Sequence, residues 1–184
     1  MAFMNLRIEG DPILRKKSRP VKEIDDRIRK ILDDMVETMY KEEGVGLAAP
    51  QVGKLRRMVV IDVGQGPIKM INPEIIERSE ILEEDVEGCL SLPGFNGTVL
   101  RPEEVRLRYT DEMGEDHEVQ ARELFARCIC HEIDHLDGIL FRDRVVEEIN
   151  LANPTPEQVD YLKAHGILQD KSGEAESSAS LAEE

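Results

Sequence analysis

Cysteine is scarce in this sequence of 184 residues, which contains only Cys89, Cys128 and Cys130. Three cysteines, two of them almost adjacent, are too few for a disulfide framework, so we expect a protein of a reducing compartment. Their thiols are then free to bind metal, and the alternative for each thiol is an ordinary buried side chain.

Basic residues are in deficit: 24 lysines and arginines face 39 aspartates and glutamates, for a formal net charge of −15. This balance speaks against sequence-specific nucleic-acid binding and against an anionic membrane partner, although a small local basic patch is compatible with it. No apolar run approaches the length of a membrane span, and the start MAFMNLRIEG lacks the features of a signal peptide. We therefore expect a cytoplasmic protein that binds no membrane.

Internal repeats and the nucleotide-binding patterns GxxxxGK and GxGxxG are also missing. The length suits one domain with a proper core. We expect a single domain over residues 1–169 and an acidic, disordered tail over residues 170–184, because DKSGEAESSASLAEE has no apolar face to bury.

The hydrophobic period changes along the chain from helical to strand-like and back. Residues 25–43 predict an amphipathic helix that ends at Gly44. Strand patterns and short connections follow between residues 57 and 120, in RMVVIDV, IKMINPEIIERSEIL, EVRLRYT and HEVQ. A second helix ends at Gly138, and a short helix runs from the capping residue Thr155 to Gly166. The fold class predicted is α+β, with antiparallel β-sheets folded around the second helix.

That second helix carries CHEIDHLDGILF, which contains the pattern HExxH. Residues four apart lie on one helical face, so His131 and His135 can close on a single metal ion while Glu132 lies beside it. The alternative is a solvated helix with two ordinary histidines. The helical spacing of apolar residues upstream and Gly138 downstream favour a metal site.

A catalytic site of this type needs a third protein ligand and one open position. In one protease group the third ligand is the last residue of HExxHxxGxxH, but this chain has Phe141 there. The other histidines, His117 and His165, lie in polar segments typical of a hairpin and a helix end. We therefore expect a cysteine or a carboxylate as the third ligand.

Helix geometry ranks the three cysteines. Cys128 lies about 10.5 Å along the helix from His135, which is too far for one ion with ligand bonds of about 2.0–2.3 Å. Cys130 points about 100° away from its neighbour His131. Cys89 lies in EGCLSLPG, a bend that can present a thiolate from a strand edge, and is the best candidate. Two downstream acids remain as alternatives, Glu147 and Glu148.

A third unusual stretch is GVGLAAPQVG, at residues 44–53. It could be no more than a tight loop of small residues. Near a metal, small residues allow a peptide backbone to lie close, and Gln51 offers an amide donor to a developing oxyanion.

Together, GVGLAAPQVG, EGCLSLP and HEIDHLDG resemble, in order and spacing, the three motifs of the peptide deformylase family. The resemblance runs from about residue 5, including GDPILR at residues 10–15, to about residue 150. It implies a metal-dependent hydrolase that removes the formyl group from the N-terminal methionine of new polypeptides. Two alternatives are an HExxH metallo-endopeptidase and a non-enzymatic binding module stabilised by a metal.

The resemblance also implies roles for individual residues. The three that look like metal ligands are Cys89, His131 and His135. Glu132 looks like the catalytic acid and base, and the oxyanion donors look like Gln51 and the backbone N–H of Leu90. Substrate binding is implied for a strand formed by Gly44, Val45 and Gly46. A buried ion pair behind the methionine pocket is implied for Glu87 and Arg101.

The cofactor implied by the resemblance is one divalent ion per chain, Fe(II) in cells and Zn(II) or Ni(II) after purification, whereas ligand chemistry alone suggests zinc. The partners implied are N-formylmethionyl nascent polypeptides and, transiently, the ribosome, although the short C-terminal helix is no obvious docking element. We expect a monomer. One departure is Cys130, where the family commonly has Gln, and we expect it to affect packing and oxidation sensitivity rather than ligation.

Overall fold

The computed structural model describes residues 3–168, and its helices and antiparallel strands confirm the predicted α+β class. The chain divides into two compact units, one that ends at Glu148 and one that begins at Ile149, and each is described by itself. The predicted domain limit at residue 169 and the predicted tail over residues 170–184 lie outside the described residues, so both stay predictions.

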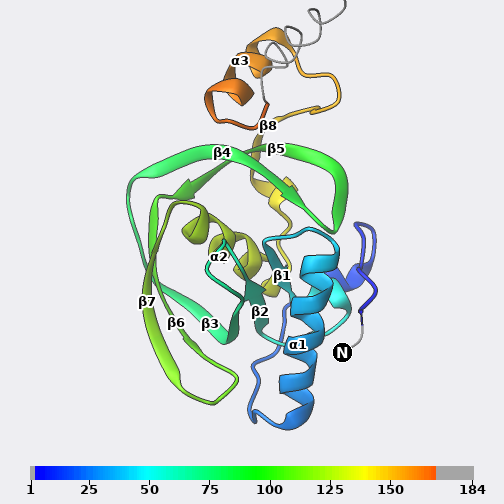
Figure 1. The fold of residues 1–184 in the computed structure, drawn as a ribbon, viewed down its shortest axis with the longest axis vertical. Coiled ribbons are helices and arrows are strands. Elements are labelled where there is room, and N and C mark those ends of the chain that lie inside the picture. Colours follow the sequence, from blue (N-terminus) through cyan, green and yellow to red (C-terminus); the bar gives the residue numbers. More distant parts are fainter. Residues whose placement is uncertain (1–2, 169–184) are drawn as a thin grey trace, which may run out of the picture. The chain divides into compact units, whose positions relative to one another are not determined.

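The first unit contains two antiparallel sheets, with strand orders β1-β2-β3-β6-β7 and β4-β5-β8 (Figure 1). The strands of the five-stranded sheet are β1 (Gly46–Ala48), β2 (Met58–Ile61), β3 (Ile68–Arg78), β6 (Glu104–Thr110) and β7 (Asp116–Arg122). Those of the three-stranded sheet are β4 (Leu82–Cys89), β5 (Leu92–Pro102) and β8 (Val145–Glu148). Short 3-10 helices precede α1 at η1 (Pro12–Arg15), separate β1 from β2 at η2 (Ala49–Val52) and precede β8 at η3 (Phe141–Arg144).

The β4–β5 hairpin is the part of the fold that the sequence analysis missed. The run IKMINPEIIERSEIL was predicted as one strand, but it ends as β3 at Arg78, and β4 starts a new strand at Leu82. β5 was not predicted at all, because it contains two glycines and two prolines, residues that normally indicate turns. Its tight turn pairs Cys89 with Leu92 and so fixes the position of the EGCLS motif.

Helix α1 (Asp26–Lys41) starts as predicted, because the Asp25 carboxylate accepts a hydrogen bond of 2.8 Å from the Ile28 amide. Its end differs from the prediction. Glu43, not Gly44, adopts the left-handed conformation, with φ of 56°, and Gly44 donates from the next position to the Met39 carbonyl at 2.9 Å. A glycine at position 44 is favoured for a different reason. A Cβ atom there would lie 2.7 Å from Cδ1 of Leu90.

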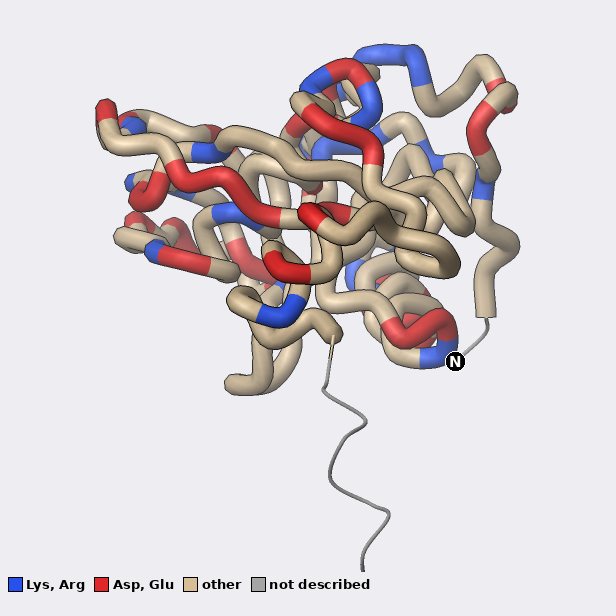
Figure 2. The backbone as a smooth tube through the Cα atoms, turned by 90° about the horizontal axis from the view of Figure 1, so that it is seen from above, with Lys and Arg blue, Asp and Glu red and all other residues tan. Residues whose placement is uncertain are grey.

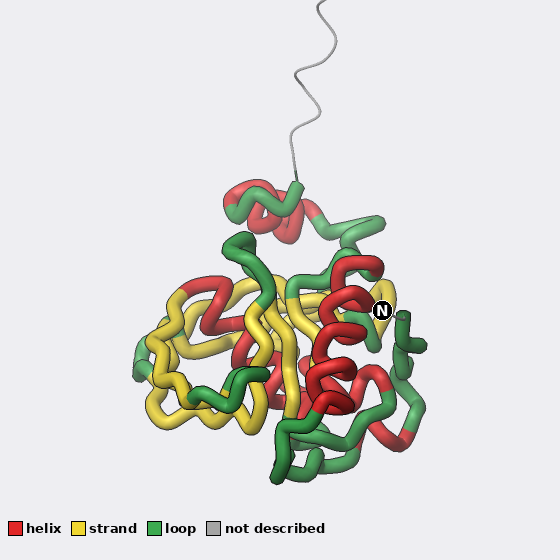
Figure 3. Tube along the Cα trace, turned by 60° about the horizontal axis from the view of Figure 1, so that its bottom comes forward, coloured by secondary structure: helices red, strands yellow, loops and turns green. Residues whose placement is uncertain are grey.

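Helix α2 (Glu123–Leu136) carries the HExxH motif and packs against strands of both sheets, whereas α1 lies outside them (Figures 1 and 3). Ala126, Ile129 and Ile133 belong to a buried cluster with side chains of β2, β3 and β6. The helix ends at Gly138 as predicted, with φ of 75° and the Ile139 amide bonded to the Asp134 carbonyl at 2.9 Å. Core packing on this face of α2 therefore fixes where both histidines lie along the helix axis and in which direction they point around it.

The second unit contains α3 (Pro156–Ala164), which begins and ends where the sequence predicts. Thr155 and Gln158 form the capping box, and Gly166 follows the helix with φ of 69°. Across residues 3–168, no helix has both the length and the apolar character to cross a membrane.

Candidate metal centre

Three potential metal-binding atoms converge at the inner end of the β4–β5 hairpin. The ligand atoms of Cys89, His131 and His135 all lie within 4.8 Å of one another, and Cys89 Sγ is 3.3 Å from His135 Nε2. Cys89 is the last residue of β4, and the histidines occupy successive turns of α2. A thiolate and two imidazoles form a donor set that suits one divalent transition metal and leaves a coordination position open.

A buried carboxylate orients one of these imidazoles. Nδ1 of His131 donates to Oε2 of Glu87 at 2.9 Å, which leaves Nε2 available as a ligand atom. Glu87 also accepts two hydrogen bonds from Arg101, at 2.9 and 3.0 Å. Burial alone would raise the pKa of Glu87, but hydrogen bonds from His131 and Arg101 hold that pKa well below its ordinary value. Glu87 is therefore an anion that fixes the tautomer of His131.

The anion belongs to a larger buried charge network. Arg127 donates to Oε1 of Glu87 at 2.9 Å and to the carbonyl of Val99 at 2.9 Å, so it ties α2 to both strands of the hairpin. Asp134 accepts from Arg101 at 2.6 Å and from Arg144 at 2.6 and 2.7 Å. Burial lowers the pKa of Arg101, but its two carboxylate partners raise it above its ordinary value, so Arg101 remains a cation. Each buried charge thus has a partner of opposite sign.

Glu132 has a different environment. Its side chain is 5% exposed, and among the described residues its Oε2 atom has no hydrogen-bond partner. Burial raises the pKa of Glu132 to about 7, although the nearby His131 acts in the opposite direction. A carboxylate with this pKa can both accept and return a proton near neutral pH.

The Gln51 amide is held in a single orientation. Its Oε1 accepts a hydrogen bond of 2.8 Å from the Ala48 amide, so Nε2 must point the other way, toward Cys89 Sγ at 3.6 Å and Ser91 Oγ at 3.2 Å. Ser91 is fully buried, and its carbonyl accepts from the Glu9 amide at 2.8 Å. The Arg7 amide donates to the Gln51 carbonyl at 2.7 Å in the same way. The N-terminal segment therefore holds both loops that border the centre.

A cavity of about 380 Å³ opens at the centre. The predicted site residues that line it are Gly44, Val45, Gly46, Gln51, Glu87, Cys89, Leu90, His131 and Glu132. β1 is an edge strand of its sheet and pairs only with β2 among the described strands, an arrangement that allows an extended peptide to add at the other edge. The cavity thus combines two of the three potential ligands, Cys89 and His131, with a carboxylate of raised pKa and the edge of β1, while His135 is buried outside its lining.

Comparisons with known proteins identify the family that has this arrangement. The family profile described as "Polypeptide deformylase" matches residues 4–150. The chain belongs to the peptide deformylase family. The peptide deformylase of Alkaliphilus metalliredigens is 57% identical over 148 residues, which cover 80% of this chain and 100% of that protein. The peptide deformylase of Finegoldia magna is 51% identical over 162 residues, with coverage of 87% and 98%.

Solved structures of peptide deformylases share the fold. The crystal structure of the Thermotoga maritima enzyme has a TM-score of 0.78 at 43% identity and covers 79% of this chain and 99% of its own. The Synechococcus elongatus enzyme in complex with actinonin has a TM-score of 0.76 at 42% identity, with coverage of 90% and 87%. The chain is therefore an enzyme that removes the formyl group from the N-terminus of peptides, and the endopeptidase and binding-module alternatives are not favoured.

The residues that the sequence analysis set aside lie elsewhere in this deformylase. Cys130 is buried in the core between α2 and the five-stranded sheet. Cys128 lines the cavity but is not part of the group of three ligand atoms, and burial raises the pKa of its thiol to about 12. His117 bonds to Asp111 in the β6–β7 hairpin. The remaining candidates also lie outside that group, in β8 and at the end of α3, namely Glu147, Glu148 and His165.

Three residues that touch the centre or its network were not predicted, namely Ser91, Arg127 and Asp134. Arg127 and Asp134 could have been found from the sequence. They occupy the same face of the helix as core residues, and a charged side chain there requires a buried partner. Ser91 gave none, because a serine in a loop is ordinary and only the paired strands β4 and β5 direct it toward Gln51.

Proposed function

We propose that this deformylase hydrolyses the formamide of N-formylmethionyl polypeptides at the centre formed by Cys89, His131 and His135. The observation that carries the proposal is the convergence of these three ligand atoms within 4.8 Å, directly beside a buried carboxylate with a raised pKa. Water adds its oxygen to the formyl carbon, the C–N bond breaks, and the products are formate and a peptide with a free amino group.

The thiolate and the two imidazoles would hold one divalent ion, Fe(II) in cells, with Zn(II) or Ni(II) as replacements after purification. When bound, the ion supplies Lewis-acid chemistry, which polarises the formyl oxygen and acidifies water. Glu87 supports the site by accepting the Nδ1 hydrogen bond of His131, as carboxylates commonly do for metal-binding histidines.

Glu132 is the proposed acid and base. Its unpartnered Oε2 accepts the proton from the attacking water, and its pKa near neutrality allows it to deliver that proton to the leaving nitrogen. The carboxylate returns to its starting state at the end of each turnover, so one residue serves both proton transfers.

Two groups are proposed to stabilise the negative charge that develops on the formyl oxygen. Gln51 has one Nε2 hydrogen directed at the centre, because its Oε1 is committed to Ala48. The second donor is proposed to be the backbone N–H of Leu90, a residue that follows Cys89 in the β4–β5 turn and lines the same cavity. Donors fixed before the reaction begins lose little energy in reorganisation.

The substrate is proposed to bind as an extended strand along residues 44–46, at the edge of β1 away from β2. Its methionine side chain then enters the cavity between Val86, Leu90 and Leu124, which supply apolar contacts. Glu87 and Arg101 form the charged layer behind this pocket. We also propose that the enzyme is a cytoplasmic monomer that meets nascent polypeptides at the ribosome.

Formate release from a formyl-methionyl peptide, measured on the purified enzyme together with its metal content, tests the proposal. We expect formate release in proportion to bound metal, no acetate release from the acetylated peptide, and no cleavage of internal peptide bonds. Cleavage of internal bonds without formate release would contradict the proposal in favour of an endopeptidase. Full activity in the metal-free protein would contradict the metal centre while leaving the reaction in place.

A further inference from the structure

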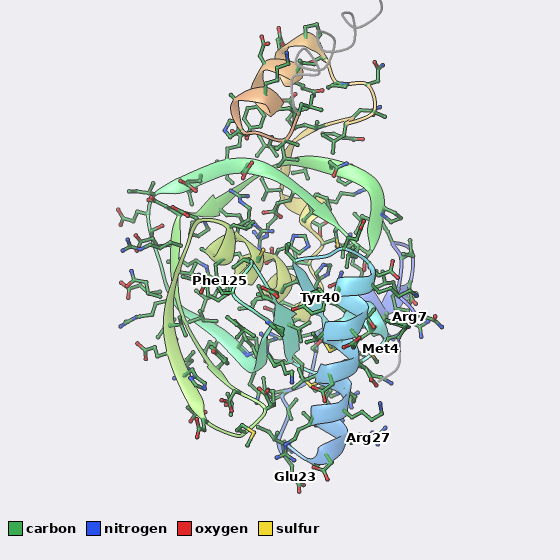
Figure 4. All side chains as sticks on the ribbon, viewed as in Figure 1. Met4, Arg7, Glu23, Arg27, Tyr40 and Phe125 are labelled. Carbon is green, nitrogen blue, oxygen red and sulfur yellow. The ribbon has the colours of Figure 1, made fainter. Side chains whose placement is uncertain are left out.

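A second hollow, of about 890 Å³, lies on the surface of the first unit and shares no lining residue with the catalytic cavity. It is formed by residues 19–23, the first turns of α1 and residues 53–56. Five cationic side chains line it: Arg19, Lys22, Arg27, Lys54 and Arg56. All five are exposed, and Arg27 lies near Glu23 at the N-terminal end of α1, far from Tyr40 at the other end (Figure 4).

These cations are unusual because they lack acidic partners. None of the five has a carboxylate within 4.0 Å in residues 3–168, whereas most other lysines and arginines of that range form at least one ion pair. The two acids in the lining, Glu23 and Asp25, do not balance the five cations, so the formal charge of the lining is +3 (five less two). A basic surface on a chain of net charge −15, where acidic positions recur along the backbone (Figure 2), favours an anionic partner from outside.

The backbone beneath the cations is fixed. Arg19 and Arg56 form a parallel bridge, in which the Arg19 amide donates to the Leu55 carbonyl at 3.2 Å and the Arg57 amide donates to the Arg19 carbonyl at 2.9 Å. Asn72 binds both the amide and the carbonyl of Val21, at 2.8 and 2.9 Å. The spacing of the charges is therefore set by the fold, not by a mobile loop.

We propose that this hollow, the basic hollow, docks the phosphate backbone of structured RNA. A single small anion would need buried, converging donors, whereas these cations are exposed and come from three chain segments, which suits several phosphates at once. No aromatic side chain lines the hollow, so unpaired bases have nothing to stack on and the contacts are to the backbone of a duplex. Binding is thus independent of sequence.

The choice of RNA rests on the proposed function, because an enzyme that acts on nascent polypeptides meets its substrate beside an RNA-rich assembly. The five cations lack acidic partners among residues 3–168 whichever anionic partner binds. Because the two linings share no residue, RNA binding and formate release can be measured and can fail separately.

The test is fluorescence anisotropy of a labelled RNA hairpin with the full chain, at salt concentrations from about 50 to 200 mM. The variant Arg19→Gln/Lys54→Gln/Arg56→Gln removes three cations of the basic hollow. Its matched control, Arg106→Gln/Arg108→Gln/Arg122→Gln, removes the same charge from β6 and β7. We expect the first variant to bind RNA at least about tenfold more weakly and its salt slope to fall by about 2.7, since each lost phosphate contact removes about 0.9.

The control variant should bind within about threefold of the unaltered enzyme, and both variants should release formate at the unaltered rate, which shows that they are folded. If the first variant does not fold, the variant Lys22→Gln/Arg27→Gln replaces it. We then expect weaker RNA binding and a salt slope reduced by the same amount for each of its two lost phosphate contacts. Equal losses in both variants, no salt-dependent binding by the unaltered enzyme, or equally tight binding of polyglutamate or anionic vesicles would overturn the proposal.

Discussion

A Cβ atom built on Gly46 lies 2.5 Å from Oε1 of Glu132. Gly46→Ala should therefore displace the proposed base and lower formate release by about tenfold or more, which is 1.4 kcal/mol of barrier. The matched comparison is the Glu132→Gln background, in which Gly46→Ala should add little further loss if it acts by displacing Glu132. Steady-state kinetics on the single and double variants checks this, and losses that multiply would show that displacement of Glu132 is not the cause.

Replacement of Glu132 by Gln should leave metal content unchanged, because Glu132 is not one of the proposed ligands. Turnover should fall by about 10² to 10⁴, the range for loss of a general acid and base. Metal analysis and formate release on the same preparation measure both effects. Undiminished turnover would mean that another group moves the proton.

The three cysteines can be compared in one assay. Cys89→Ser should lose metal and activity together, because a serine hydroxyl replaces a bound thiolate poorly. Cys128→Ser and Cys130→Ser should keep the metal and lose stability instead, since both thiols are buried in apolar surroundings. A Cys89→Ser enzyme with its full metal complement, beside a Cys130→Ser enzyme without metal, would refute the ligand assignment.

Ser91 is predicted to be a positioning residue that acts through Gln51. Ser91→Ala removes the acceptor of one Nε2 hydrogen bond and should lower kcat by about two- to tenfold, with metal content unchanged. Gln51→Ala alone should cost about 10² to 10³. In the double variant, loss of the serine hydroxyl should add nothing. Independent, multiplied losses would instead indicate that Ser91 acts through general packing.

Cys128 should resist alkylation at neutral pH, although it lines the catalytic cavity. Burial raises the pKa of its thiol to about 12, so the reactive thiolate is rare below that pH. In a Cys130→Ser background, the rate of iodoacetamide modification at Cys128 should rise about tenfold per pH unit through pH 10. Mass spectrometry of the tryptic peptide measures it, and a rate that levels off near pH 8.5 would contradict the raised pKa.

The sequence analysis succeeded where a local signal carries the information. The capping residues Asp25 and Thr155 and the terminal Gly138 have direct hydrogen-bonding consequences, so the helix boundaries could be read from the sequence. The spacing of His131 and His135 is likewise a property of one helix. Cys89 could be ranked only by elimination, and the family resemblance supplied its role.

What the sequence analysis missed depends on contacts between distant segments. β5 contains residues that usually break strands, and only its pairing with β4 and β8 stabilises it. Ser91 meets Gln51 across 40 positions of sequence, and Arg127 meets Glu87 across 40 as well. Helix α1 was predicted to run to residue 43 but ends at Lys41, and the left-handed residue after it is Glu43, which tolerates a conformation that usually favours glycine.

The candidate metal centre can assemble only late in folding. It needs the two loops that border it and the N-terminal segment that holds those loops. Cys89 precedes His135 by 46 positions, and Arg7 and Glu9 must find the carbonyls of Gln51 and Ser91 before those loops are held. A chain still being synthesised, and stopped before α2, has the thiolate and the amide but neither histidine. Binding of one ion by all three proposed ligands therefore requires synthesis through α2 and docking of that helix against the turn between β4 and β5.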